Sequence, residues 1–124
     1  MPIVGAELGV PTVIVDRHPR PGDQWRSRYK SLCLHDPVWY DHLPYLPFPR
    51  NWPIFAPKDK IGDWLEMYTR VMELNYWAST EAKSASYDED AGEWRVVVER
   101  EGSEVVLRPR QLVIVYAESR TGFI

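Results

Sequence analysis

The sequence has one cysteine, Cys33, so no disulfide bond can form within the chain. That count fits a protein of the reducing cytoplasm. The chain also lacks an excess of positive charge, because 15 lysines and arginines stand against 18 acidic residues, for a formal net charge of −3. It therefore has no basic field to attract nucleic acid or an anionic membrane, and we expect neither as a partner.

Long hydrophobic runs are missing as well. No run approaches the roughly 18 to 20 apolar residues that cross a membrane. The first residues do not combine basic and apolar positions as a secretory signal does. His18, His35, His42 and Cys33 do not stand at a spacing typical of a metal site. We therefore expect a cytoplasmic protein without a resident metal.

Glycine is scarce where a dinucleotide-binding fold needs it. Residues 3–6 begin like the fingerprint of such a fold, but Gly5 is followed only by Gly9, whereas G-x-G-x-x-G needs three glycines in one turn. We interpret residues 7–11 as the last turn of the helix that follows a phosphate-binding loop, with Gly9 as its C-terminal cap. On this interpretation the loop itself is missing. The alternative is that residues 4–8 are a frayed end of the chain.

Hydrophobic residues make up 44% of the 124 residues, which is enough for one domain with a core. Residues 13–15 form a β-branched run without alternation, typical of a strand buried on both faces in a parallel sheet. The run ends at Asp16. A carboxylate at the carboxyl end of a parallel strand can accept hydrogen bonds from both hydroxyls of a ribose. We therefore predict that Asp16 recognises a ribose.

A basic turn follows and leads to a second apolar segment. Its four arginines either contact phosphates or are solvated loop charges: Arg17, Arg20, Arg26 and Arg28. Trp25 either stacks on a flat heterocycle or packs in the core. Residues 32–34 predict a short strand that ends at His35, which either takes part in chemistry or is simply hydrogen-bonded in place. Cys33 is most simply a small buried hydrophobic residue.

Proline and aromatic residues dominate residues 37–57. Because proline disfavours the helical conformation in the residue before it, we predict an ordered, polyproline-like loop rather than a helix. Three roles are open for this loop. It covers a flavin or lines a substrate channel, it wraps the core as a structural element, or it is a peptide-binding module with an aromatic groove. We favour the structural wrap.

The second half of the chain predicts regular elements. Residues 58–74 have helical spacing, and the predicted core-facing side chains are Trp64, Leu65, Tyr68 and Met72. Short strands separated by turn signals predict an antiparallel β-meander over residues 82–108. The apolar run at residues 112–115 predicts a return to the main parallel sheet. The predicted fold class is α/β.

Taken together, these motifs resemble the flavin-containing monooxygenases, especially the indole-pyruvate type of bacteria and plants. The resemblance rests on the acid at the end of the strand, the turn Gly22-Asp23-Gln24-Trp25, the segment Tyr-x-x-Leu-x-Leu-His-x-Pro at residues 29–37, and the proline-rich residues 43–49. It covers roughly residues 8–115. It implies a single partial FAD/NAD(P)-binding Rossmann-like domain over residues 1–124, with a small antiparallel β-meander.

The resemblance further implies an oxidoreductase that uses FAD and NADPH to insert oxygen into a small-molecule substrate. Asp16 would hold the adenosine ribose, and the backbone amide of Ala82 would touch the adenine. His35 would face the reactive side of the flavin and is the candidate catalytic residue. The cofactor-binding residues implied are Asp16, Arg17, Gln24, Trp25 and Ala82. The substrate and the oligomeric state stay open.

The sequence departs from the family at both ends. Relatives continue the last strand with Ala-Thr-Gly, whereas this chain continues with residues 116–124 of unrelated sequence, and the nicotinamide-binding domain is not among these residues. Together with the incomplete loop at Gly5, this predicts that the chain by itself binds FAD weakly and does not turn over substrate. The alternative to a portion of a monooxygenase is a non-catalytic remnant, or a small interaction domain, that has lost cofactor binding.

Overall fold

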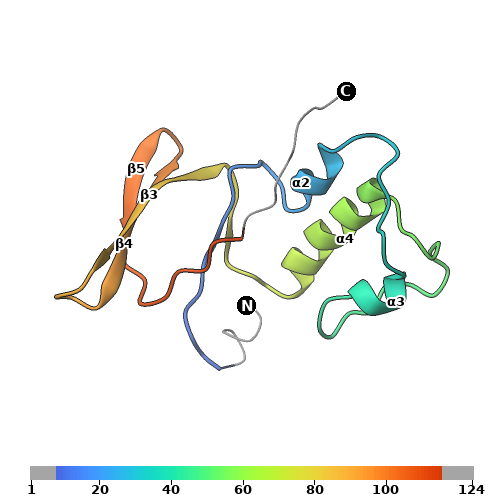
Figure 1. Cartoon of the computed structure of the whole chain (residues 1–124), viewed down its shortest axis with the longest axis horizontal. Coiled ribbons are helices and arrows are strands. Elements are labelled where there is room, and N and C mark those ends of the chain that lie inside the picture. Colours follow the sequence, from blue (N-terminus) through green and yellow to red (C-terminus); the bar gives the residue numbers. More distant parts are fainter. Residues whose placement is uncertain (1–7, 116–124) are drawn as a thin grey trace.

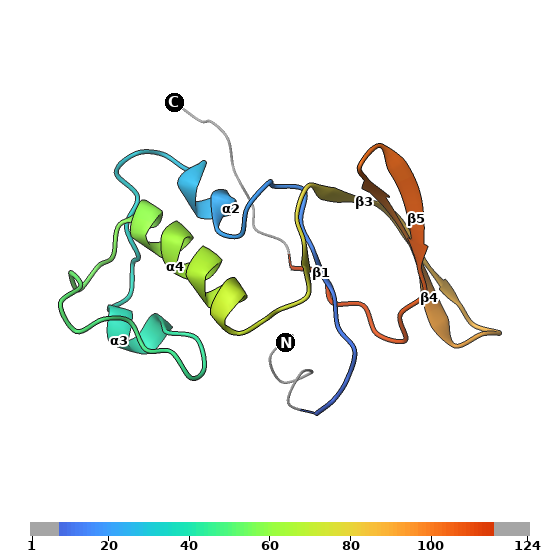
Figure 2. The ribbon, with the colours of Figure 1, turned by 180° about the vertical axis from the view of Figure 1, so that it is seen from behind.

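The computed structural model describes residues 8–115. In chain order the elements are β1 (Ile14–Val15), α2 (Asp23–Arg26), α3 (Val38–Asp41), α4 (Lys58–Val71), β2 (Tyr76–Trp77), β3 (Thr80–Asp88), β4 (Glu93–Arg100) and β5 (Ser103–Leu107). The three helices gather at one end of the long axis and the meander β3–β5 lies at the other (Figure 1). Seen from behind, β1 runs between these two parts (Figure 2).

Two sequence predictions lie outside the described residues. They are the incomplete phosphate-binding loop around Gly5 and the departure from the family after residue 115. Residues 8 and 9 form a turn, and Gly9 has a φ of 66°. A positive φ is the conformation that a glycine adopts where it ends a helix.

The predicted parallel strand exists, but it is short. β1 pairs in parallel with β2, with Ile14 opposite Tyr76 and Val15 opposite Trp77, and Asp16 follows the last residue of β1. The side chains of residues 13–15 are partly exposed, so the expected burial on both faces is wrong. The reason is that β1 has a single neighbouring strand within the described part of the chain.

The prediction of a strand at residues 112–115 is wrong. These residues pair with no strand among residues 8–115, and Val113, Ile114 and Val115 are 75%, 73% and 87% exposed. β-branched side chains favour a strand only where a neighbouring backbone exchanges hydrogen bonds with it.

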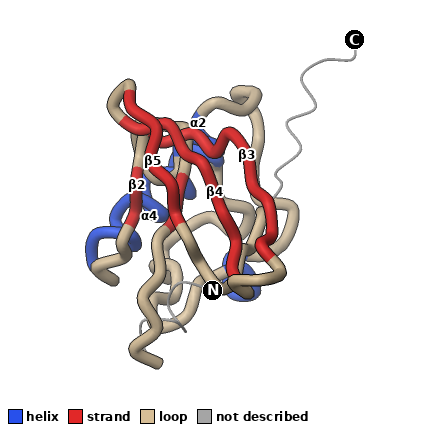
Figure 3. The backbone as a smooth tube through the Cα atoms, turned by 90° about the vertical axis from the view of Figure 1, so that its left-hand side faces the viewer, coloured by secondary structure: helices blue, strands red, loops and turns tan. Residues whose placement is uncertain are grey.

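The antiparallel meander is confirmed. β3 pairs with β4, and β4 pairs with β5, each antiparallel. Figure 3 shows the three strands side by side. β3 begins at Thr80, two residues before the predicted start, and an irregularity between Ala82 and Ser84 interrupts its register. The central strand carries most of the burial, because Val96, Val97 and Val98 are at most 7% exposed.

The predicted long helix is confirmed as α4, which ends at Val71. Its residue Ile61 forms a buried cluster with Val38 and Ala56, and five partly buried side chains pack against this cluster: Trp25, Leu34, Phe48, Trp52 and Leu65. The Tyr68 side chain is buried, and its hydroxyl donates to the Pro44 carbonyl at 2.9 Å. The helix therefore holds the proline-rich segment against the core.

Lys58 at the start of α4 is buried although it is charged. Its Nζ donates to the Arg26 carbonyl at 2.7 Å and to the Asp59 carboxylate at 2.7 Å. The first bond satisfies a carbonyl at the end of α2, where intrahelical partners are lacking. At the other end of α2, an added Cβ on Gly22 would lie 2.2 Å from the Gly62 carbonyl oxygen, so α2 and α4 meet backbone to backbone.

Three local predictions need correction. The turn at residues 22–25 contains the one-turn helix α2, which begins after Gly22 at a φ of 85°. Residues 38–41 are helical as α3, because Pro37 restricts only the residue before it and the next restricted residue is Leu43. Residues 32–34 form no strand but a single bridge from Cys33 to Pro57, and Cys33 is partly exposed.

Candidate functional site

The Asp16 carboxylate lies at the carboxyl end of β1 and is held by two residues. Its Oδ1 accepts from the His18 backbone N–H at 2.9 Å and from the His18 ring Nδ1 at 2.8 Å. Its Oδ2 accepts from the Tyr76 hydroxyl at 2.6 Å. The site is therefore a rigid carboxylate with its donors already arranged around it.

These bonds set the charge of the site. Partial burial by itself raises the pKa of Asp16, but the hydrogen bonds from the His18 backbone, the Tyr76 hydroxyl and the His18 ring outweigh it, so the pKa lies below the ordinary 3.8. Burial and the Asp16 carboxylate both raise the pKa of the Tyr76 hydroxyl far above its ordinary value. At neutral pH, Asp16 is therefore ionised and Tyr76 keeps its proton.

Replacement of Asp16 by asparagine should change how stability depends on pH. Because the pKa of Asp16 is lowered on folding, its stabilising contribution is fully present above its unfolded value, near 3.8, and is lost as pH falls through the folded value. The difference in free energy of unfolding between wild type and Asp16→Asn, measured in urea from pH 2 to pH 7, should be constant above about pH 5 and shrink below it. A pH-independent difference would show that folding does not lower this pKa.

Backbone hydrogen bonds bring Asp16 close to the beginning of the meander. The Asp16 N–H donates to the Trp77 carbonyl at 3.1 Å, the Thr80 N–H donates to the Asp16 carbonyl at 2.9 Å, and the Ser79 N–H donates to the His18 carbonyl at 2.9 Å. Ala82, the predicted adenine contact, follows two residues after Thr80 and is exposed. The structure thus brings the strand of Asp16 and the start of the strand of Ala82 together.

The four arginines of the basic turn have different surroundings. The Arg26 guanidinium is occupied by ion pairs within the protein. It contacts the carboxylates of Asp23, Asp63 and Glu66 and so joins α2 to α4. Arg20 lies 3.1 Å from Asp23, and the Arg28 guanidinium lies 5.4 Å from the centre of the Trp25 ring. Arg17, next to Asp16, is exposed, and its charge lies close enough to Glu81 to help lower the pKa of that carboxyl group. Arg17 is therefore the best placed of the four to meet a ligand phosphate.

The residues predicted to border the flavin lie at the helical end. Trp25 packs against the buried cluster and is partly exposed, so both of its possible roles fit. Gln24, beside it, is partly exposed too. His35 is exposed, and its ring makes no hydrogen bond in the described part of the chain. Its neighbour Leu34 packs on the same cluster as Trp25. The structure thus groups Trp25 and the segment of His35 on one core.

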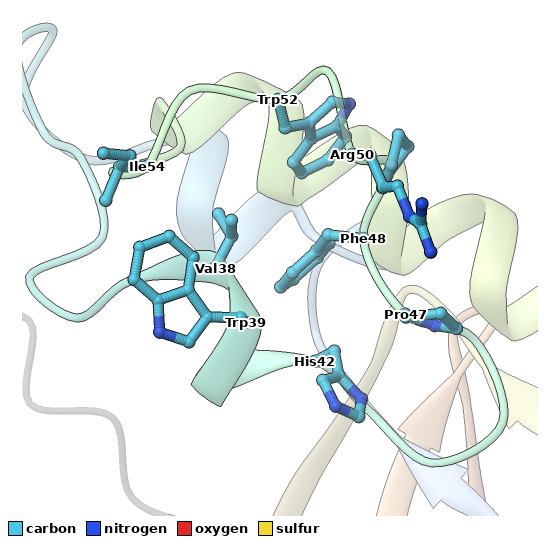
Figure 4. A pocket seen from close by; sticks show the side chains of 9 residues that line it. Val38, Trp39, His42, Pro47, Phe48, Arg50, Trp52 and Ile54 are labelled. Atoms are coloured by element: carbon cyan, nitrogen blue, oxygen red, sulfur yellow. The ribbon is translucent and has the colours of Figure 1, made fainter.

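The proline-rich segment borders an open pocket of about 420 Å³. Its lining residues come from α3 and the loop after it: Val38, Trp39, His42, Pro47, Phe48, Pro49, Arg50, Trp52 and Ile54. In Figure 4, Trp39 and Phe48 lie on either side of Val38. The Phe48 ring stacks on Trp52 with centroids 5.0 Å apart. The pocket is apolar and aromatic, which suits a flat organic molecule and leaves all three predicted roles of the segment open.

Within residues 8–115, no group of three or more His, Cys, Asp or Glu side chains is placed to hold a metal ion. Among the helices in this range, none is both long enough and apolar enough to cross a membrane.

Comparison with curated proteins gives close relatives for most of the chain. A probable indole-3-pyruvate monooxygenase of Arabidopsis thaliana, YUCCA9, is 34% identical over 114 residues, which cover 91% of this chain and 27% of the relative. An indole-3-pyruvate monooxygenase of Oryza sativa subsp. japonica, YUCCA1, is 32% identical over 115 residues, 92% of this chain and 28% of the relative. The chain thus spans about a quarter of the length of these relatives. No protein-family model matches the sequence.

Solved structures agree on the fold. A flavin-containing monooxygenase from Stenotrophomonas maltophilia superimposes with a TM-score of 0.69 at 23% identity, over 87% of this chain and 32% of that one. The bacillithiol disulfide reductase Bdr (YpdA) from Bacillus cereus superimposes with a TM-score of 0.77 at 8% identity, over 88% of this chain and 33% of that one. The predicted fold class, a partial FAD-binding α/β fold with an antiparallel meander, is confirmed by these superpositions.

The residues that sequence reasoning missed are the partners of Asp16. The pattern Asp-x-His carried a local signal, because an aspartate side chain often accepts from the backbone two residues on. Tyr76 carried none, since it lies 60 residues from Asp16 in the sequence and only the pairing of β1 with β2 brings the two together.

Proposed function

Given that the chain is homologous to a segment of the flavin-containing monooxygenases, we propose that it forms the part of an FAD-dependent, NADPH-using monooxygenase that holds the adenosine end of FAD. The observation that carries the proposal is the ionised Asp16 carboxylate at the carboxyl end of a parallel strand, hydrogen-bonded through its backbone to the strand that leads into the meander.

The residues present fit the adenosine end of the cofactor. The Asp16 side chain is 29% exposed, so a ribose hydroxyl can reach it. Three hydrogen bonds occupy the carboxylate, which has about four acceptor positions, and one position remains for a ligand. Arg17 supplies an exposed guanidinium next to it for a phosphate, and Ala82 is an exposed residue of β3.

When bound, the flavin would supply the redox chemistry of oxygen insertion, with NADPH as the reductant. Within this chain, Gln24, Trp25 and His35 would border it, and the aromatic pocket would help to exclude water or admit a flat substrate. The relatives point to indole-3-pyruvate as the kind of substrate to try first. We place the protein in the cytoplasm, since a single cysteine suits a reducing compartment.

The second candidate is a non-catalytic remnant or small interaction domain. It keeps the fold but gives no reason for an ionised, partly exposed carboxylate at the end of β1. The relatives, which are named as monooxygenases over nearly the whole chain, favour the first candidate.

Replacement of Asp16 by alanine should weaken FAD binding by about 1 to 3 kcal/mol, the cost of a lost hydrogen bond to a charged group. The measurement is a flavin-fluorescence titration of wild type and variant at neutral pH. The matched control is Asp90→Ala, because Asp90 is an exposed carboxylate in the turn after β3 and its side chain makes no hydrogen bond within residues 8–115. Equal affinities in all three proteins would remove Asp16 from the site.

A further inference from the structure

We propose that His18 and Tyr76 limit Asp16 to one ribose hydroxyl, which it accepts through Oδ2. The inference rests on the proposed function and adds a specificity to it. The sequence alone predicted that one carboxylate accepts from both ribose hydroxyls. We narrow this expectation, because the protein itself already uses three of the roughly four acceptor positions.

The Oδ1 atom of Asp16 has no position left for a ligand. It accepts from the His18 backbone N–H at 2.9 Å and from the His18 ring Nδ1 at 2.8 Å. An ionised carboxylate only accepts hydrogen bonds, so Nδ1 must carry the proton of the second bond. A carboxylate oxygen offers about two lone-pair positions, and both are filled.

The Oδ2 atom of Asp16 keeps one free acceptor position for a ligand. It accepts from the Tyr76 hydroxyl at 2.6 Å, the short distance typical of an O–H donor on a charged acceptor. Tyr76 is fixed by the sheet, where it stands opposite Ile14. His18 and Tyr76 are therefore positioning residues, which act on a ligand only through Asp16.

The test compares three nucleotides that share adenine and one phosphate: AMP, 2′-deoxy-AMP and 3′-deoxy-AMP. Their affinities for the full chain are measured by NMR titration, which detects millimolar binding. In the wild type, one of the two deoxy nucleotides should bind about ten-fold or more weakly than AMP, and the other should bind as AMP does. AMP is chosen because it separates ribose recognition from pyrophosphate recognition.

Two variants of His18 make the test specific. His18→Ala opens one position on Oδ1, and both deoxy nucleotides should then bind more weakly than AMP. His18→Asn keeps an amide nitrogen close to the place of Nδ1, and should keep the wild-type pattern. A general loss of structure would weaken all three nucleotides equally, so the change of pattern reports on the acceptor positions alone.

The outcomes separate this inference from the proposed function. If the wild type binds AMP but discriminates against both deoxy nucleotides, the single-hydroxyl inference is wrong and the proposed function stands. If it discriminates against neither, Asp16 does not recognise the ribose, and the inference and the proposed role of Asp16 both fail. An unchanged pattern in His18→Ala also overturns it. If the chain binds none of the three nucleotides at millimolar concentration, the inference and the proposed function both fail.

Discussion

Replacement of Gly22 by alanine should destabilise the protein by about 2 to 6 kcal/mol. The residue has a φ of 85°, where a side chain costs roughly 1 to 3 kcal/mol. Its new Cβ would also stand 2.2 Å from the Gly62 carbonyl oxygen and 2.7 Å from its Cα, in the backbone of α4. Moving helix α4 away adds a further overpacking cost of roughly 1 to 3 kcal/mol. Such a loss is a large part of the ~5 to 15 kcal/mol by which domains are stable.

Gly102 provides the matched control for this experiment. It has a similar φ of 75°, but nothing lies within 4 Å of a Cβ added there. Gly102→Ala therefore carries only the backbone cost. Urea denaturation of both variants separates backbone strain from the contact between α2 and α4. Equal losses in the two variants would show that the two helices do not approach closely at Gly22.

Replacement of Trp64 by alanine is expected to cost about 3 to 5 kcal/mol, the range for removing a large aromatic side chain from a core. Its ring centre lies 5.4 Å from that of Phe48 and 5.3 Å from that of Trp52. These contacts attach the proline-rich segment to α4, so the same variant should expose the segment to proteolysis. The free energy of unfolding is measured in urea.

Two further variants test the assignment of Trp64 to the core. Trp39 is 56% exposed, and Trp39→Ala should cost at most about 1 kcal/mol. Trp64→Phe keeps an aromatic ring and removes an indole N–H that is buried without a hydrogen-bond partner in the described part of the chain, so it should cost much less than Trp64→Ala. A loss below about 1 kcal/mol for Trp64→Ala would place this face of α4 in solvent.

Local patterns predicted the elements whose contacts are local. Helical spacing found α4, and alternation with turn signals found the meander, because each is stabilised by residues close in sequence. The position of Asp16 after a strand was predicted from the β-branched residues 13–15, although the strand's partner is distant in sequence. The close contact between α2 and α4 could not be predicted from the sequence. A glycine inside a helical pattern, such as Gly62, only lowers helix propensity, and its role becomes clear from the close approach of Gly22.

The sequence-based predictions were wrong or incomplete where the structure depends on residues that are distant in the sequence. Residues 112–115 have the side chains of a buried strand, but without a neighbouring strand within residues 8–115 they form no strand, and Val113, Ile114 and Val115 are exposed. At the candidate site, the Asp16 carboxylate was predictable, but the number of its acceptor positions that stay free for a ligand was not. That number depends on Tyr76, 60 residues away, and on the orientation of the His18 ring.

The pairing of β1 with β2 also affects how the chain folds. The hairpins of the meander close short loops, whereas the contact of Asp16 with Tyr76 closes one of 60 residues and pays more chain entropy. Local structure forms before such distant pairings, so we expect α4 and the meander to be native-like before the two short strands join. The carboxylate environment is then completed in the last step of folding. A nucleotide bound to Asp16 would therefore slow unfolding, because β1 and β2 would have to separate while it is bound.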